Sequence, residues 1–254
     1  MIYDVQKASM WKRASAYLCD IILLVIAAVG VAFLFSTVLD YEGVVNDREA
    51  IRTRYETDYA VDFDISEEDY NKLTEDQRKW LDDAYAKFAT DDEVNRLDMT
   101  IINFSLIITS FAVLIPYLLF EFVIPLLFKN GQTIGKKVFS VGVMRVDGVR
   151  MNTLQLFIRT MLGKCVLGTL LPIMMVLMIL FNVMPFIALA ILFILLIVQL
   201  CCVAFTSLHT PIHELISATV SVDFSSQLIF DSPEALLEYK KALHAQKANE
   251  AEYR

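Results

Sequence analysis

Long apolar runs alternate with polar segments along the chain. The first run, Ala14–Val38, is interrupted only by Asp20, and the second, Met99–Phe128, includes two prolines and Glu121. A helix of about 20 apolar residues crosses the hydrocarbon of a bilayer, whereas a signal peptide has an apolar core of only about 7–15 residues. We therefore expect both runs to be retained transmembrane helices.

The third apolar region, Leu154–Leu208, is too long for one spanning helix. Asn182-Val-Met-Pro185 near its middle is a turn signal, so we predict two helices, Leu154–Phe181 and Pro185–Leu208. The pattern predicts an all-α polytopic membrane protein with four transmembrane helices. Its segments are 1–38 (N-terminus and first span), 39–98 (polar loop), 99–128 (second span), 129–153 (basic turn and hairpin), 154–208 (third and fourth spans) and 209–254 (C-terminal segment).

The polar loop between the first two spans is predicted to be helical. Ser66-Glu-Glu-Asp69 and Thr74-Glu-Asp-Gln77 are typical helix N-termini. Apolar side chains that could share one helix face follow at helical spacing. They are Leu73, Trp80, Leu81, Tyr85 and Phe88.

Short strands and a last helix are expected outside the apolar runs. Val138–Met151 alternates in part between apolar and polar residues and contains Asp147-Gly148, which is a hairpin signal. Ala218–Val222 also has the composition of a strand, so a small sheet could form from these pieces. Ser232-Pro233-Glu234 is typical of a helix N-terminus, and a polar helix through the mid-240s is expected.

Composition supports a membrane protein and shows an uneven charge distribution. The chain has 254 residues, 56% of them hydrophobic, and a mean hydropathy of +0.52. Its net charge is −8, but Asp40–Asp98 alone holds 19 acidic against 8 basic residues. The remainder holds 11 acidic against 14 basic residues, so the acidity belongs to the polar loop.

Basic residues in the short segments predict the orientation. Lys7, Lys12 and Arg13 precede the first span, and the segment Lys129–Arg159 has six basic residues and one acid. Short loops rich in Lys and Arg face the cytoplasm. We therefore expect both termini to be cytoplasmic in the cell membrane and the acidic loop to be extracytoplasmic.

Two short motifs invite a chemical interpretation. Gly131-Gln-Thr-Ile-Gly-Lys-Lys137 has three residues between its glycines, where a phosphate-binding P-loop has four, and it lacks the final hydroxyl residue. We instead expect a tight turn that holds Lys136 and Lys137 near lipid phosphates. His209-Thr-Pro-Ile-His213-Glu214 departs from the zinc-protease pattern, so we expect no metal.

Charged residues near one end of the spans are the strongest candidates for function. Asp20 lies two helical turns after Arg13, and a carboxylate inside a membrane is costly unless it faces a partner or a water-filled cavity. Glu121 poses the same problem. Arg159 and Lys164 are positive candidates on the third span, and His213 with Glu214 follows the fourth.

These charges allow two interpretations. They could form a clasp that fixes helix packing, which the residues alone favour, or they could line an ion or proton path. In the second case Asp20 and Glu121 would alternately hold a proton and a cation. Glu214 would then serve the inner entrance, and Arg13 would tune the acidity of the carboxylates.

Several motifs together resemble the RDD family of membrane proteins, which is named for one arginine and two aspartates. Arg13 and Asp20 match the first two positions, and the Gly131–Lys137 stretch with Asp147-Gly148 resembles the central signature. Arg159 matches a recurring arginine. His213-Glu214-Leu-Ile-Ser-Ala-Thr219 resembles the ending, with Glu214 where the family has aspartate.

The resemblance implies a transporter-like protein, with sodium, lithium or potassium exchange for protons attributed to one branch. The alternative is a non-transporting membrane scaffold or assembly factor that binds a partner protein. The expected partners are lipids, a monovalent cation and protons, and a second copy or another protein. No nucleophile–base pair, cofactor loop or aromatic–basic platform is recognisable, so we expect no enzyme activity, no cofactor and no nucleic acid.

Overall fold

The computed structural model describes residues 4–128, 131–206 and 210–252, and most of them are helical. Among these residues, four helices are long and apolar enough to span a membrane. They are Met10–Val38, Asp92–Leu127, Thr153–Leu180 and Pro185–Phe205. Each overlaps one predicted run, so the four-span prediction is confirmed, although the second helix begins at Asp92 rather than at Met99.

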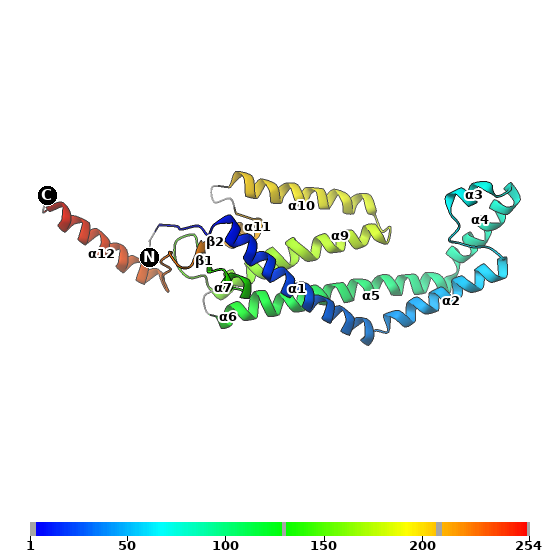
Figure 1. The fold of residues 1–254 in the computed structure, drawn as a ribbon, viewed down its shortest axis with the longest axis horizontal. Coiled ribbons are helices and arrows are strands. Elements are labelled where there is room, and N and C mark those ends of the chain that lie inside the picture. Colours follow the sequence, from blue (N-terminus) through cyan, green and yellow to red (C-terminus); the bar gives the residue numbers. More distant parts are fainter. Residues whose placement is uncertain (1–3, 129–130, 207–209, 253–254) are drawn as a thin grey trace. The chain divides into compact units, whose positions relative to one another are not determined.

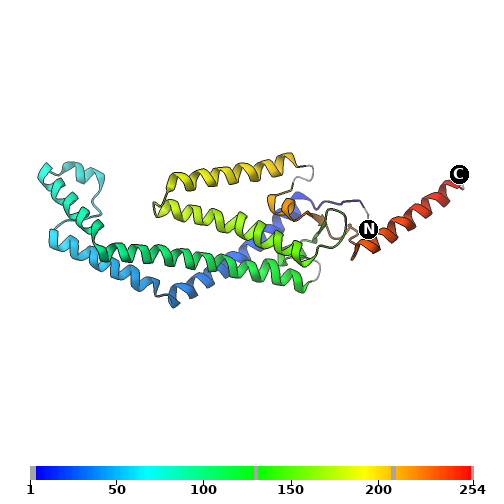
Figure 2. The ribbon, with the colours of Figure 1, turned by 180° about the vertical axis from the view of Figure 1, so that it is seen from behind.

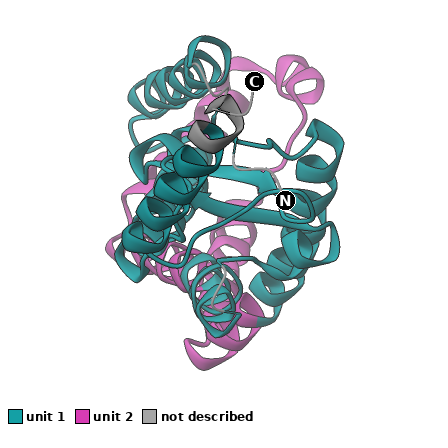
Figure 3. Ribbon diagram, turned by 90° about the vertical axis from the view of Figure 1, so that its left-hand side faces the viewer, with its two compact units in different colours: residues 1–30, 112–254 teal, residues 31–111 magenta. Residues whose placement is uncertain are grey.

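The chain forms two compact units, which Figure 3 colours separately. Unit 1 is Met1–Gly30 with Ala112–Arg254, and unit 2 is Val31–Phe111. Helices α1 (Met10–Val38) and α5 (Asp92–Pro116) each contribute to both units.

Unit 2 contains the acidic helices α2 (Tyr41–Tyr59), α3 (Glu67–Lys72) and α4 (Glu75–Thr90). Both predicted helix starts are confirmed, because Ser66 caps α3, and Thr74 with Gln77 forms a capping box at α4. A small core supports these helices, made of Ile51, Phe88 and Val94 with Tyr55, Phe63 and Leu97.

The predicted apolar face of unit 2 is correct only in part. Leu81 and Phe88 are buried, but Trp80 and Tyr85 are 54% and 56% exposed. Leu73 lies at the C-cap of α3, outside α4. The helix breaks between Lys72 and Glu75, so Leu73 cannot share the face that begins after Thr74.

Unit 1 contains most of the spanning helices, several of which Figure 1 labels, and two π-helical segments. The second span passes from α5 through η1 (Tyr117–Val123) to α6 (Ile124–Leu127), and the third passes from α8 (Thr153–Phe157) through η2 (Ile158–Leu170) to α9 (Leu171–Leu180). Helices α9 and α10 (Pro185–Phe205) lie side by side after a tight turn, as Figure 2 also shows.

A two-stranded antiparallel sheet confirms the expected strands but not a hairpin. Strand β1 (Val141–Arg145) pairs with β2 (Thr219–Asp223), and the third and fourth spans lie between these two strands in sequence. Asp147-Gly148 does make a turn, with Gly148 N–H donating to the Arg145 carbonyl at 3.0 Å. However, Val149, which follows the turn, forms an isolated β-bridge with Phe230, so the residues after the turn do not form a second hairpin strand.

Two short helices and one long helix complete unit 1. The short helices are α7 (Ile134–Val138) before β1 and α11 (Ile212–Ile216) before β2, and the long helix α12 (Pro233–Glu252) follows β2. The last of these starts where Ser232-Pro233 predicted and extends beyond the mid-240s. Its start is packed into a cluster of Val149, Phe230 and Leu236.

Candidate functional site

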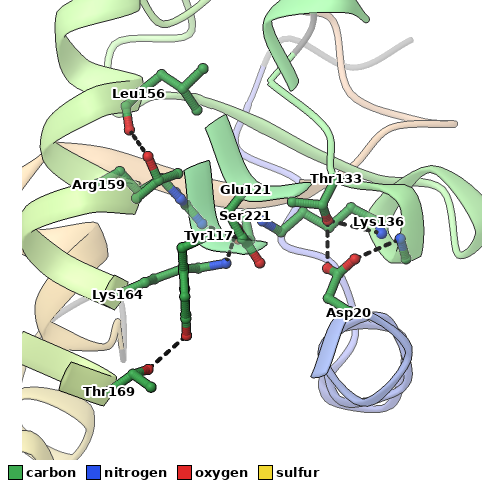
Figure 4. A network of polar contacts seen from close by, with 12 residues as sticks. Asp20, Tyr117, Glu121, Thr133, Lys136, Leu156, Arg159, Lys164, Thr169 and Ser221 are labelled. Atoms are coloured by element: carbon green, nitrogen blue, oxygen red, sulfur yellow. Dashed lines mark hydrogen bonds and ion pairs between the residues drawn. The ribbon is translucent and has the colours of Figure 1, made fainter. Parts of the chain in front are cut away.

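Asp20 joins helix α1 to the glycine-containing turn between the second and third spans. Its Oδ1 accepts the Gly135 N–H at 2.8 Å, and its Oδ2 accepts the Thr133 hydroxyl at 2.5 Å (Figure 4). Thr133 also caps α7 by accepting the Lys136 N–H. The carboxylate is only 6% exposed, so its two donors compensate for much of its lost hydration.

Gly135 is required by this close approach. A Cβ at position 135 would lie 2.3 Å from the Ala16 carbonyl oxygen and 2.8 Å from Asp20 Oδ1. The first of these is backbone, so it cannot rotate away. A side chain here would force α7 away from α1 and break the N–H contact to Asp20.

Glu121 and Lys164 form a buried ion pair between the two π-helical segments. Glu121 Oε2 and Lys164 Nζ are 2.6 Å apart, and their side chains are 2% and 8% exposed. Arg159 lies on the same segment as Lys164, five residues earlier. In a π-helix the backbone hydrogen bonds join residues i and i+5. The Arg159 and Lys164 side chains are therefore separated by roughly one helical turn and project from adjacent sides of the helix.

Arg159 ties the third span to the strand β2. Its guanidinium donates through NH1 to Thr219 Oγ1 at 2.6 Å and through NH2 to Glu214 Oε1 at 2.7 Å. The Ser221 hydroxyl donates to the same Glu214 oxygen. In the part of the chain that the structure describes, Glu214 Oε2 is buried without a hydrogen-bond partner.

These charged side chains line one cavity of about 680 Å³ within unit 1. Its walls are largely apolar side chains of α1, η2 and α10. Its carboxylates are Asp20, Glu121 and Glu214, and its basic groups are Arg13, Lys136, Arg159 and Lys164. His213, Tyr117 and Thr169 also line it.

Burial and crowding of positive charge shift two basic groups toward their neutral forms. Burial, reinforced by Lys164 and Arg159, lowers the pKa of Lys136 from 10.5 to about 7. Burial and the same neighbouring cations hold the pKa of His213 far below its ordinary range, so this imidazole is neutral at pH 7. Burial alone would raise the pKa of Glu214, but Arg159 and Ser221 outweigh it and the net shift is downward.

The structure brings together all six residues of the predicted charge network at this cavity. It pairs Glu121 with Lys164 and Glu214 with Arg159. Arg13 donates to Met10 Sδ at 3.2 Å, and its Nε has no hydrogen-bond partner among the described residues.

The two adjacent lysines, for which the sequence predicted one role, are separated. Lys136 lines the cavity, whereas Lys137 is exposed and its Nζ lies 3.9 Å from the centre of the Phe128 ring. Contact of Lys137 with lipid phosphate stays a prediction.

No group of three or more His, Cys, Asp or Glu side chains that could hold a metal ion occurs within residues 4–128, 131–206 and 210–252. His209 of the histidine motif lies outside these residues.

Sequence reasoning missed the neutral residues that hold the charges. Thr133 and Gly135 stand inside the glycine motif, but its turn gave no sign of contact with Asp20. Thr219 and Ser221 alternate along β2, which places both hydroxyls on one face of the strand. That alternation was the available signal for a polar site facing Arg159.

A comparison with family models finds a match, described as the RDD family, over residues 7–218. No curated protein and no solved structure matches the chain. The matched range includes every charged residue of the cavity.

Proposed function

The chain belongs to the RDD family of membrane proteins, and from this premise we propose that it is a multi-pass transporter that exchanges a monovalent cation for a proton. The supporting observation is the cavity of about 680 Å³ in which acidic and basic groups of three spans face one another. Charged groups inside membrane proteins commonly mark ion or proton pathways.

Asp20 is the best candidate for the cation site. Glu121 and Glu214 each contact a positive side chain within 2.7 Å, whereas the described residues give Asp20 only neutral hydrogen-bond donors. A cation at Asp20 therefore need not break an ion pair. Rotation of the Thr133 hydroxyl would turn a donor away from the carboxylate and present an oxygen to the cation.

Lys136 is the best candidate for the proton site. Its pKa of about 7 lets the amine gain and lose a proton near neutral pH. Its charge acts on both Asp20 and Glu121 through space, so a protonated Lys136 disfavours a second positive charge beside Asp20. When the Lys136 amine loses its proton, a cation bound at Asp20 supplies the positive charge that the ammonium carried. Lys136 thus takes the proton-carrying role that the sequence analysis gave to Asp20 and Glu121, which were expected to hold a proton and a cation alternately.

The exchange can be tested in sealed liposomes that contain the purified protein and a trapped pH dye. An imposed sodium gradient should drive protons across the membrane in the direction opposite to sodium flow, and Asp20→Asn should abolish this proton movement. Asp231→Asn is the matched control, because the Asp231 side chain is 77% exposed and its ion pair is with the half-exposed Arg150. Exchange that persists in Asp20→Asn, or no exchange by folded wild-type protein, would refute the proposal.

A second candidate function is a membrane scaffold that transports nothing. The two buried ion pairs favour it, because a paired charge can fix helix packing without moving. In a scaffold, Asp20→Asn should lower thermal stability and recovery of a partner protein. Wild-type liposomes should then show no cation-driven proton movement.

The orientation belongs to the same proposal. We propose cytoplasmic termini in the cell membrane, contact with lipids, and assembly with a second copy or another protein. Trypsin added outside intact spheroplasts should then cut within the acidic segment Asp40–Asp98 and spare α12. The opposite pattern would reverse the orientation.

A further inference from the structure

Unit 2 has a pocket of its own, with a volume of about 350 Å³. It lies between the end of α2, the turn that follows, and the first turns of α4. Ile65, Leu73 and Leu81 provide apolar surface, Trp80 provides an aromatic wall, and Asp62 and Asp76 provide carboxylates. Neither proposed function uses this pocket.

Trp80 is both exposed and held in place. More than half of its surface is accessible, yet its Nε1 donates to the Tyr59 carbonyl at 2.8 Å. Its ring also lies 5.5 Å from the ring of Tyr59, centroid to centroid. A rigid exposed indole loses little conformational entropy on binding, which is why tryptophan is frequent among interface residues that dominate affinity.

The charge around the pocket selects the chemistry of an occupant. Its two charged lining residues are both acidic, and the surrounding segment Asp40–Asp98 has 19 acidic against 8 basic residues. A lysine or arginine side chain fits this combination, because its methylene stem packs on apolar surface. Its charged head can then reach the carboxylates and the face of the indole.

We propose that this pocket docks a basic side chain from a segment of a partner protein that carries several lysines or arginines. The acidity extends over the helices α2 to α4, well beyond two carboxylates, and therefore matches a partner with several positive charges. Complementary charge of this extent raises association rates and specificity. The apolar lining supplies the contact that distinguishes docking from loose counterion attraction.

The test uses the intrinsic fluorescence of Trp80 in the full chain. The protein has two tryptophans, and Trp11 is 84% exposed, so Trp11→Phe leaves Trp80 as the reporter. This variant, in a neutral detergent, is titrated with a short peptide of arginine and leucine. We expect a saturable change in Trp80 emission that weakens with salt, and no change with a peptide in which glutamate replaces arginine.

Matched charge variants separate docking from general electrostatics. Asp62→Asn with Asp76→Asn should weaken binding about fivefold or more, as expected for the loss of two partly exposed charge contacts. Glu42→Gln with Asp47→Asn removes the same charge at the other end of α2, at exposed positions outside the pocket, and should change affinity less than twofold. Melting curves confirm that each variant is folded.

Three results would overturn the docking proposal. They are an equal loss in both double variants, a Trp80 signal that does not saturate, and spermine binding as tightly as the peptide. The last would assign the pocket to small organic cations. None of these results depends on transport, so they leave the exchange proposal untouched.

Discussion

Removing one partner of the Glu121–Lys164 pair should destabilise the protein strongly, whereas removing both should cost much less. The two side chains are 2.6 Å apart, and neither is more than 8% exposed. Glu121→Gln leaves the Lys164 ammonium buried without its counterion, and Lys164→Met leaves the Glu121 carboxylate in the same state. The double variant leaves neither charge.

The magnitude follows from the burial of both groups. Breaking a buried ion pair from one side typically costs about 3–5 kcal/mol, while neutral replacement of both partners is often close to neutral. At about 2–4 °C per kcal/mol, each single variant should lower the melting temperature by roughly 6–20 °C. The double variant should recover at least half of the larger loss.

The assay measures thermal unfolding of wild type, the two single variants and the double variant in the same detergent, with near-UV circular dichroism as the signal. A double-mutant cycle then isolates the coupling between the two positions. Arg48→Gln with Asp98→Asn is the matched control, because that pair has the same 2.6 Å separation but is 30% and 40% exposed. Its coupling should stay below about 1 kcal/mol. A Glu121–Lys164 coupling no larger than the control's would refute the reasoning.

Three further predictions concern contacts within unit 1. Gly135→Ala should destabilise the protein by at least about 1–3 kcal/mol, because the new Cβ would meet the Ala16 carbonyl oxygen. Gly30→Ala should not, because nothing lies within 4 Å of a Cβ at that position. Melting curves of the two variants check this difference. Arg159→Lys should cost about 1–3 kcal/mol in the same assay, because one ammonium cannot reproduce both guanidinium contacts, to Thr219 and to Glu214. Lys12 holds the pKa of Asp223 at about 2, below its ordinary 3.8. This pair should therefore stabilise the fold above about pH 4 and lose that contribution of less than about 1 kcal/mol as pH falls from about 4 to 2. Asp223→Asn should flatten the pH dependence of unfolding in that window, and an unchanged slope would contradict the assignment.

The spans were predictable because each one leaves a simple record in the sequence. About 20 consecutive apolar residues identify a span wherever they occur, and Asn182 to Pro185 marked the turn between the last two. The helix starts at Ser66 and Thr74 were equally local, because a cap needs only its own first turn. The opposite charges of the cavity could be grouped because each is costly in lipid without a partner.

The pairing of those charges was not predictable from the sequence. Lys164 and Arg159 take neighbouring faces because their helix is π-helical, and α-helical spacing would have separated them. Strand β1 pairs with β2, although the third and fourth spans separate the two strands in sequence. The hairpin signal at Asp147-Gly148 therefore predicted the turn correctly, but the strand that pairs with β1 is not the segment that follows this turn. Lys136 and Lys137 are neighbours in sequence, and only the direction in which α7 starts decides which of them faces the cavity.

The most direct test of the exchange proposal compares these two lysines. Sodium-driven proton movement is measured in liposomes across pH 6–9 for wild type, Lys136→Gln and Lys137→Gln. If Lys136 carries the proton, its variant should lose exchange at every pH. Wild type and Lys137→Gln should share a profile whose midpoint lies near the Lys136 pKa of about 7. Exchange by Lys136→Gln with an unchanged pH profile would contradict the account.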